Sequence, residues 1–333
     1  MAAGWTSSPG SGTAGWYRDF AEHELHGISP SYEAICRGVA ADAQLCARLD
    51  ALPPGKQQPN LLLGAVRFLG GPVSSWLEFR RFAVQRWDDV AATMLAGRTQ
   101  TNEPRRCATL LPVLAALPQP LALLEVGASA GLCLYPDRYS YRYEHPRRYV
   151  GPPLAELGDG KPLLRCAVSG PAPLPERLPE VVWRAGLDLN PLDVTSEQDL
   201  RWLESLIWPE ETDRFGLLHE AASVAAADPP VLIRGDLASD FAALAAEAPA
   251  DATLVVFHTA VLAYVDEPGR AAFADTVDRL AAQRPTVWLA NEAPGVVAGT
   301  ENLPRSRSRF VLTRDRLPLA MTGGHGQSLD WLG

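Results

Sequence analysis

The spacing of apolar residues divides the chain into two parts. From residue 16 to about 118, stretches such as YRDFAEHELHG, NLLLGAVRFL and RRCATLLPVLAAL place apolar residues every three or four positions, which is typical of amphipathic helices. From residue 119 onward, short apolar runs alternate with helical stretches, which predicts a parallel sheet with helical crossovers. The pattern therefore predicts a helical N-terminal region at 16–118, on the substrate side as a lid, and an α/β domain at 119–333.

Five apolar runs in the second part are predicted strands, each ending in or beside a polar or acidic residue. They are LALLEV at 121–126, VVWRAGLD at 181–188, PVLIRGD at 230–236, TLVVFH at 253–258 and TVWLANE at 286–292. The final SRFVLTRDRLPLAMT predicts an antiparallel hairpin at the edge of the sheet. Residues 134–180 contain Tyr- and Pro-rich strand-like pieces that interrupt the alternation, so we interpret them as an insertion after the first helix.

Composition is that of an ordinary globular chain, with 47% hydrophobic and 21% charged residues in 333. Residues 1–15 are rich in Gly, Ser and Ala and predict a disordered tail. No stretch is typical of a signal peptide or a membrane span, so we expect a cytoplasmic protein. The five cysteines are scattered with no C-x-x-C, which indicates neither disulfides nor a metal site.

The formal net charge of −9 disfavours nucleic acid as a partner, because binding to phosphates depends on clustered Lys and Arg. A small-molecule substrate fits this charge better. Neither composition nor charge indicates an oligomeric state.

The stretch LALLEVGASAGLCL at 121–134 permits two interpretations. As G-x-S-x-G it is a nucleophile elbow that presents Ser129 on a strand-to-helix turn. As E-x-G-x-x-x-G it is a nucleotide loop, in which Glu125 closes a buried strand and Gly127 and Gly131 let the backbone approach a ligand.

The order of these motifs resembles that of the class I S-adenosylmethionine-dependent methyltransferases. LLEVGASAG resembles their first motif, GLDLNP at 186–191 their second, RGDL at 234–237 their third and LVVFHTAVLAYV at 254–265 their fourth. The whole chain also resembles an uncharacterised bacterial family, through TQTNEPRRCATLLP, WRAGLDLNPLDV, VVFHTAVLAY and NEAPGV. The resemblance implies a Rossmann-like methyltransferase sheet, S-adenosylmethionine as cofactor and a small molecule as methyl acceptor.

The resemblance also assigns residues to the cofactor and to the substrate. The predicted cofactor-binding residues are Glu125, Gly127, Ser129, Gly131, Asp188, Asp236 and Leu237. Asp188 is expected at the ribose hydroxyls and Asp236 at the adenine amino group, since a carboxylate only accepts hydrogen bonds. The predicted substrate-binding residues are Asn102, Arg105, Asn291 and Glu292, and His258 is the candidate general base.

Several alternatives remain open at this point. Glu144 lies nearer to the glycine loop along the chain than Asp188 does, so it is an alternative ribose-binding acid. A serine hydrolase would use Ser129 with Asp236 and with His258 or His325, but it needs strands before its elbow, where this chain is helical. A cofactor-binding protein without transferase activity is the third interpretation.

Overall fold

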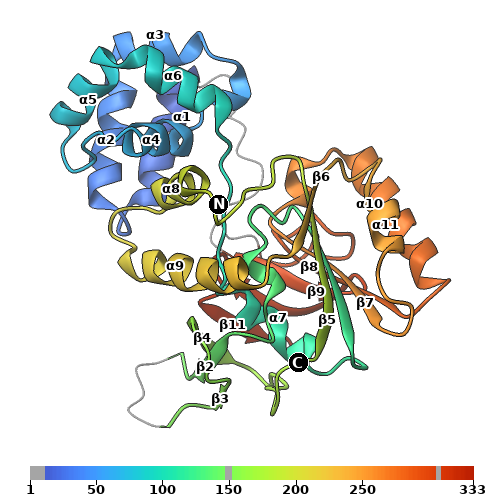
Figure 1. Cartoon of the computed structure of the whole chain (residues 1–333). Helices are drawn as coiled ribbons and strands as arrows, with labels where there is room; N and C mark the ends of the chain where they lie inside the picture. The colour runs from blue at the N-terminus through green and yellow to red at the C-terminus, as the bar shows by residue number, and fades with distance from the viewer. Residues whose placement is uncertain (1–11, 147–151, 305–308) are drawn as a thin grey trace. The chain divides into compact units, whose positions relative to one another are not determined.

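The computed structural model describes residues 12–146, 152–304 and 309–333, and the chain forms two compact units (Figure 1). One unit, here called the sheet unit, comprises Asn102–Val194 and Leu217–Gly333. The other, the helical unit, comprises Thr195–Gly216 and the described residues up to Thr101. No helix in the described part of the chain has the length and apolar character that a membrane span requires.

The chain before residue 119 is largely helical where the structure describes it, as the periodicity predicts, but the two units divide the chain differently from the prediction. Residues 102–118 belong to the sheet unit, and Thr195–Gly216 joins the helical unit. The helices of the helical unit are α1 Gly12–Phe20, the π-helical turn η1 Ala21–Leu25, α2 Pro30–Ala41, α3 Ala43–Asp50, the 3₁₀ turn η2 Pro54–Lys56, α4 Pro59–Phe68, α5 Trp76–Gln85, α6 Trp87–Ala96 and α8 Glu197–Leu206. α2 and α3 are separate because Asp42 adopts an extended conformation and its side chain accepts from the Leu45 amide as an N-cap.

The predicted N-terminal tail falls mainly outside the described residues. Residues 1–11 are not described, and α1 begins at Gly12. Residues 12–15 therefore belong to a helix, in which Thr13 is buried, and not to a tail.

The sheet unit contains a single eleven-stranded sheet among the described residues. Its strands are β1 Leu121–Val126, β2 Ser140–Glu144, β3 Ala155–Leu157, β4 Leu163–Ser169, β5 Val181–Asp188, β6 Val231–Arg234, β7 Thr253–Thr259, β8 Thr286–Glu292, β9 Arg309–Arg314, β10 Leu317–Gly323 and β11 Ser328–Trp331. Their order is β3-β2-β4-β11-β10-β9-β8-β7-β1-β5-β6. The five strands predicted from apolar runs are all present, with ends that differ from the prediction by at most two residues.

The five predicted strands form the parallel part of the sheet, in the order β6-β5-β1-β7-β8. Among these five strands, β5 and β6 follow β1 on one side, and β7 and β8 then lie on the other side of β1. A parallel sheet with such a reversal binds ligands outside the carboxyl ends of its strands, at the point where the order reverses. In this unit that point lies between β1 and β7.

The predicted C-terminal hairpin is present, but its predicted place at the edge of the sheet is wrong, because β11 and β4 continue the sheet beyond β10. β9 and β10 pair antiparallel, and β8 pairs antiparallel with β9. The two residues of the connecting turn, Asp315 and Arg316, have φ of 50° and 68°. Positive φ at both central positions defines the type of two-residue turn whose twist matches that of the flanking strands.

The insertion at 134–180 joins the sheet at its far end. It supplies β2, β3 and β4, and β4 pairs with β11, so β5 remains free to pair directly with β1. The helix expected after the glycine loop is shorter than predicted, because only the 3₁₀ turn η3 Leu132–Leu134 forms there.

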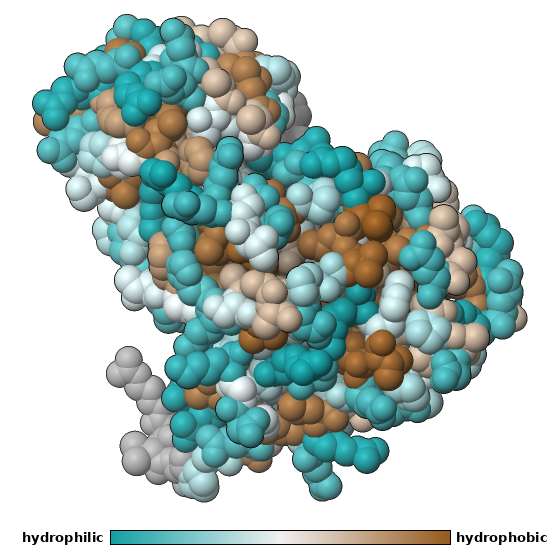
Figure 2. All heavy atoms as spheres, viewed as in Figure 1, coloured by the Kyte–Doolittle hydropathy of each residue, from teal (hydrophilic) through white to brown (hydrophobic). Residues whose placement is uncertain are grey.

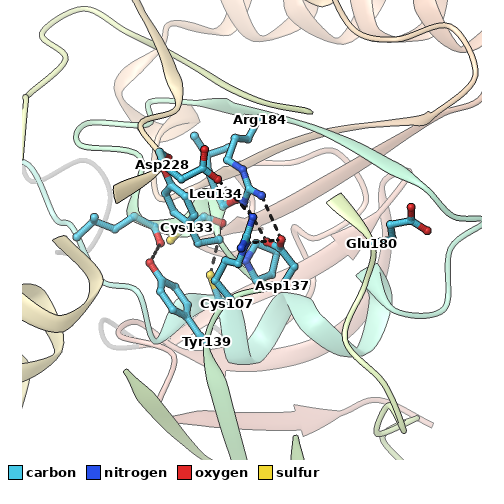
Figure 3. Close-up of polar contacts among 12 residues, drawn as sticks. Cys107, Cys133, Leu134, Asp137, Tyr139, Glu180, Arg184 and Asp228 are labelled. Carbon is cyan, nitrogen blue, oxygen red and sulfur yellow. Dashed lines mark hydrogen bonds and ion pairs between the residues drawn. The ribbon is translucent and has the colours of Figure 1, made fainter. Parts of the chain in front are cut away.

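Polar contacts attach the start of the insertion to the parallel strands (Figure 3). Arg184 of β5 binds both carboxylate oxygens of Asp137 at 3.0 and 3.1 Å and donates to the Leu134 carbonyl. The Tyr139 hydroxyl donates to the Leu132 carbonyl at 2.8 Å. These bonds hold η3 against β5, so the insertion leaves the order of the parallel strands unchanged.

Helices cover the two faces of the parallel strands (Figure 1). α10 Phe241–Ala246 and α11 Glu267–Ala281 bury Phe241 and Phe273 in a core cluster with Val126, Val256 and Trp288. α7 Arg106–Leu114 packs on the opposite face, where alternate strand residues point. α9 Thr212–Ala227 contributes residues to both units.

The surface of the sheet unit mixes hydrophilic and hydrophobic side chains (Figure 2). β6 is an edge strand, and its Val231 and Ile233 are 45% and 39% exposed.

Candidate functional site

Five of the residues predicted for the site lie at the carboxyl ends of the parallel strands, and one of them is Asn291, the penultimate residue of β8. Glu125 is the penultimate residue of β1, Asp188 ends β5, His258 precedes the last residue of β7, and Glu292 ends β8. Glu144 lies on β2, eight positions from β5 in the sheet order. Glu144 therefore lies away from the strand ends that hold the other predicted residues.

The loop after β1 has left-handed backbone at alternate residues. Gly127, Ser129 and Gly131 have φ of 69°, 51° and 71°. A Cβ atom on Gly127 would lie 2.4 Å from a methyl carbon of Val261, in the loop after β7. Gly127 is therefore required both by its φ and by the close approach of these two loops.

Every backbone N–H group of this loop already donates a hydrogen bond within the sheet unit. The acceptors are the Leu187 carbonyl for Gly127 and Ala128, Asp188 Oδ2 for Ser129, Asn102 Oδ1 for Ala130, and the Ala128 carbonyl for Gly131. Phosphate-binding loops and oxyanion holes work by pointing unpaired backbone N–H groups at an anion. This loop, in the described conformation, offers none.

Both carboxylate oxygens of Asp188 accept hydrogen bonds from backbone amides of the protein, a role that the sequence did not predict. Its Oδ2 accepts from the Ser129 amide at 2.8 Å, and its Oδ1 accepts from the Asn190 amide at 2.7 Å. Each carboxylate oxygen can accept a second hydrogen bond. Asp188 therefore holds the glycine loop in place and still has acceptor capacity toward a ligand.

Asn102 clamps the same loop from the N-terminal side of α7. Its Nδ2 donates to Ser129 Oγ at 2.6 Å, and its Oδ1 accepts from the Ala130 amide at 3.0 Å. Ser129 is 4% exposed. The amide that follows a nucleophilic serine forms half of the oxyanion hole in an elbow, and here Asn102 occupies it.

His258 is fully buried and uses both ring nitrogens in hydrogen bonds. Nε2 accepts from Trp288 Nε1 at 2.9 Å, and Nδ1 donates to Glu292 Oε1 at 2.6 Å. Phe273 of α11 packs edge-on against the imidazole. A general base needs a nitrogen within hydrogen-bond reach of its substrate, so this geometry favours a supporting role for His258 over the expected catalytic one.

Glu292 connects His258 to the loop after β7 by hydrogen bonds. The same Oε1 atom accepts from the Val261 amide at 2.8 Å and the Leu262 amide at 3.0 Å. Val261 is the residue that meets Gly127. Glu292 and His258 therefore fix the loop that forms one side of the reversal point between β1 and β7, and this geometry does not indicate that Glu292 contacts substrate.

Glu125 is a buried carboxyl group with unused hydrogen-bonding capacity. It is 4% exposed, and its Oε2 has no hydrogen-bond partner among the described residues. Burial raises the pKa of Glu125 well above its usual value, the nearby Cys133 and Asp188 add to this effect, and Arg106 opposes it. A cation placed against Glu125 would both satisfy this oxygen and restore its charge.

The remaining predicted residues lie further from this centre. Asp236 is exposed in the turn after β6, where its Oδ1 accepts from the Ala238 amide, and Leu237 packs against the core cluster. Arg105 lies near Cys166 of β4, where its charge partly opposes the rise in the thiol pKa that burial causes. Arg105 is therefore within electrostatic range of β4, the third strand from the β3 end of the sheet.

A second polar group, not predicted from the sequence as a unit, lies on the α7 face of β7, β8, β9 and β10. Arg106 is 2% exposed, and its Nη1 donates to the carbonyl and the hydroxyl of Thr259, both at 3.1 Å. Thr322 Oγ1 donates to Asn291 Oδ1 at 2.7 Å. Thr259 is the Cα partner of Asn291, so these four residues form one cluster.

Strand register brings Thr259 and Asn291 together, and helix packing and a side-chain hydrogen bond add Arg106 and Thr322. None of these contacts can be read from composition or local periodicity. The sequence signal available was the position of Thr259 and Asn291, each directly at the end of an apolar run. No group of three or more candidate metal ligands occurs among the described residues.

Comparison with protein families gives one match, which spans almost the whole chain. The model of a family described as "Uncharacterized protein conserved in bacteria (DUF2332)" matches residues 14–331. No curated protein matches the chain, and no solved structure matches it.

Proposed function

The chain belongs to this bacterial family, DUF2332, and we propose that its sheet unit binds S-adenosylmethionine at the reversal point and transfers the methyl group to a small molecule. The observation that carries the proposal is the parallel order β6-β5-β1-β7-β8 with acidic residues at matching strand ends. Glu125 lies at the end of β1, Asp188 ends β5 and Asp236 follows β6. This is the edge at which open α/β sheets bind nucleotides.

The residues present fit the cofactor in two respects. Glu125 Oε2 is buried without a partner among the described residues, so an ammonium group placed there would complete its hydrogen bonding. Asp188 has one further acceptor position on each oxygen for the two ribose hydroxyls. Bound S-adenosylmethionine would supply a methyl group on a positively charged sulfur.

The glycine loop has a limited part in this proposal. Its N–H groups are used within the protein, so it would contribute shape and not hydrogen-bond donors. Gly131 keeps the loop close to β6, because a Cβ atom there would lie 3.2 Å from a methyl carbon of Leu232. The chain's own residues therefore hold and orient the cofactor mainly through the acids at the strand ends.

Isothermal titration of the full chain with S-adenosylmethionine and with its demethylated product tests the proposal directly. Asp236→Ala is expected to weaken binding by about 1.5–3 kcal/mol, the value of a hydrogen bond to a charged group. Asp275→Ala, an exposed acid on α11, is the matched control and should bind as the parent does. Absence of binding by the parent protein refutes the proposal.

The two alternative functions give different results in the same experiments. Binding of the cofactor without methyl transfer to any of a broad set of acceptors would favour a protein that binds the cofactor only. The hydrolase alternative has one supporting feature, the positive φ of Ser129. Against it, both nitrogens of His258 are used elsewhere, and Ser129 Oγ is bound to Asn102.

A further inference from the structure

The cluster of Arg106, Thr259, Asn291 and Thr322 contains a buried donor that the protein itself does not use. Asn291 is 0% exposed, and Thr322 fixes its carbonyl oxygen. Asn291 Nδ2 has no hydrogen-bond partner among the described residues. Leaving a buried donor unpaired costs roughly 1–3 kcal/mol, so an amide in this position is explained if a ligand supplies the acceptor.

The surroundings of Asn291 show what kind of acceptor fits. Arg106, a buried cation, reaches Thr259 across the register from Asn291 and lies over the ring of Phe310, 5.8 Å from its centroid. Phe310 is in turn the Cα partner of Thr322. The amide of Asn291 and the guanidinium of Arg106 therefore occupy the same small region on one face of the sheet.

We propose that this cluster binds the carboxylate group of a small molecule, with Asn291 Nδ2 as a hydrogen-bond donor and Arg106 supplying positive charge. A carboxylate accepts several hydrogen bonds and is attracted by a guanidinium, so it matches a site composed of a donor and a cation. The cluster lies at the carboxyl ends of β7 and β8, next to the reversal point. The partly exposed His325, in the turn between β10 and β11 that packs on α7, lies at the surface of this region.

The site also indicates the class of substrate. This inference rests on the proposed methyl transfer. A carboxylate oxygen is already ionised near neutral pH, so it can accept a methyl group without a general base. Its electron pair would form the new bond to the methyl carbon while the carbon–sulfur bond breaks and that pair stays on sulfur. The negative oxygen and the positive sulfur both become neutral, no proton moves, and the product is a methyl ester. This chemistry agrees with a site in which His258 has no free nitrogen.

Ligand-observed NMR on the full chain, with no cofactor present, tests the binding site. The probes are benzoate and phenylacetate, each compared with its primary amide and with the amine of matching skeleton. Carboxylates are expected to bind and to compete with one another, whereas amides and amines are expected not to. Preferential binding of the amines, or no binding of either carboxylate up to its solubility, overturns the proposal.

Two variants separate binding from folding. Asn291→Asp replaces the donor with an acceptor of nearly equal size, and we expect carboxylate affinity to fall roughly 10- to 100-fold. The double variant Asn291→Leu, Thr322→Val removes both hydrogen-bond partners together, a change that can be nearly neutral for stability. It should fold like the parent and lose carboxylate binding. Unchanged affinity in either variant refutes the assignment of Asn291.

The two proposals fail in distinguishable ways. Carboxylate binding by a protein that does not bind S-adenosylmethionine would refute the proposed function and leave the site standing. Cofactor binding without carboxylate binding would refute the site alone. When both bind, mass spectrometry of the carboxylate after incubation with S-adenosylmethionine should show its methyl ester, and a carboxylate that binds but stays unmethylated would refute the substrate class.

Discussion

Replacing Glu125 with glutamine should stabilise the sheet unit at neutral pH and remove part of its pH dependence. Burial raises the pKa of Glu125 well above its usual value, so the folded protein holds a proton that the unfolded chain loses near pH 4.5. Above that pH, folding must bind a proton or bury a charge, and either requirement lowers stability. The glutamine side chain of the variant is neutral at every pH and has no such penalty.

The sign and the size of this effect follow from proton linkage. Below the unfolded-state pKa both states are protonated, so Glu125 adds no pH dependence. Between the unfolded and the folded pKa the folded state holds one extra proton, and stability falls by about 1.4 kcal/mol per pH unit. Above the folded pKa the penalty becomes constant. The parent protein should therefore lose stability relative to Glu125→Gln as pH rises from about 5.

Hydrogen exchange measured by mass spectrometry is the suitable assay, because peptides from β1 and β7 report the opening of the sheet unit separately from the helical unit. Comparing the parent and the variant at the same pH cancels the intrinsic pH dependence of exchange. Glu180→Gln, which changes an exposed carboxyl group just before β5, is the control and should follow the parent. Parallel stability curves for the parent and Glu125→Gln would refute the buried, proton-holding state of Glu125.

Two further predictions concern the residues that fix the loops. Asn102→Ala should lower the free energy of unfolding, measured in urea, by roughly 1–3 kcal/mol, because the Ala130 amide loses its acceptor. Asn102→Asp keeps that acceptor and should lower it by less. Equal losses in the two variants would contradict this reasoning. His258→Ala should destabilise the protein by more than about 2 kcal/mol, because it leaves the N–H of Trp288 unpaired and creates a cavity. A variant with normal stability that loses only activity would instead support a catalytic role for His258.

The order of strands and helices could be predicted from the sequence because it depends on local pattern. The runs at 121–126, 181–188 and 286–292 have the same bounds as strands of the structure, since most residues of each run are apolar. The helix expected after Gly131 does not form beyond one 3₁₀ turn. Leu132, Cys133 and Leu134 are all buried there, and the chain then turns away into β2.

The roles of the site residues were harder to predict than their positions. The apolar runs predicted His258 and Asp188 at strand ends, which is where they lie. Their partners, however, come from segments 30 to 59 positions away, and no local pattern reports such pairings. A histidine near a strand end is compatible with catalysis and with support, and only the bond from Trp288 distinguishes the two.

Asp188 both holds the glycine loop and is the proposed acceptor for the ribose, so a substitution of Asp188 affects both roles at once. Its Oδ2 holds the Ser129 amide, so Asp188→Ala would release the glycine loop as well as remove an acceptor for the ribose. A loss of cofactor affinity in that variant would not separate the two effects. Glu125 Oε2 has no partner among the described residues, and Asp236 Oδ1 holds the Ala238 amide of its own turn. Substitutions at these two acids leave the loop bonded to Asn102 and Asp188, and they therefore measure ligand contacts more directly.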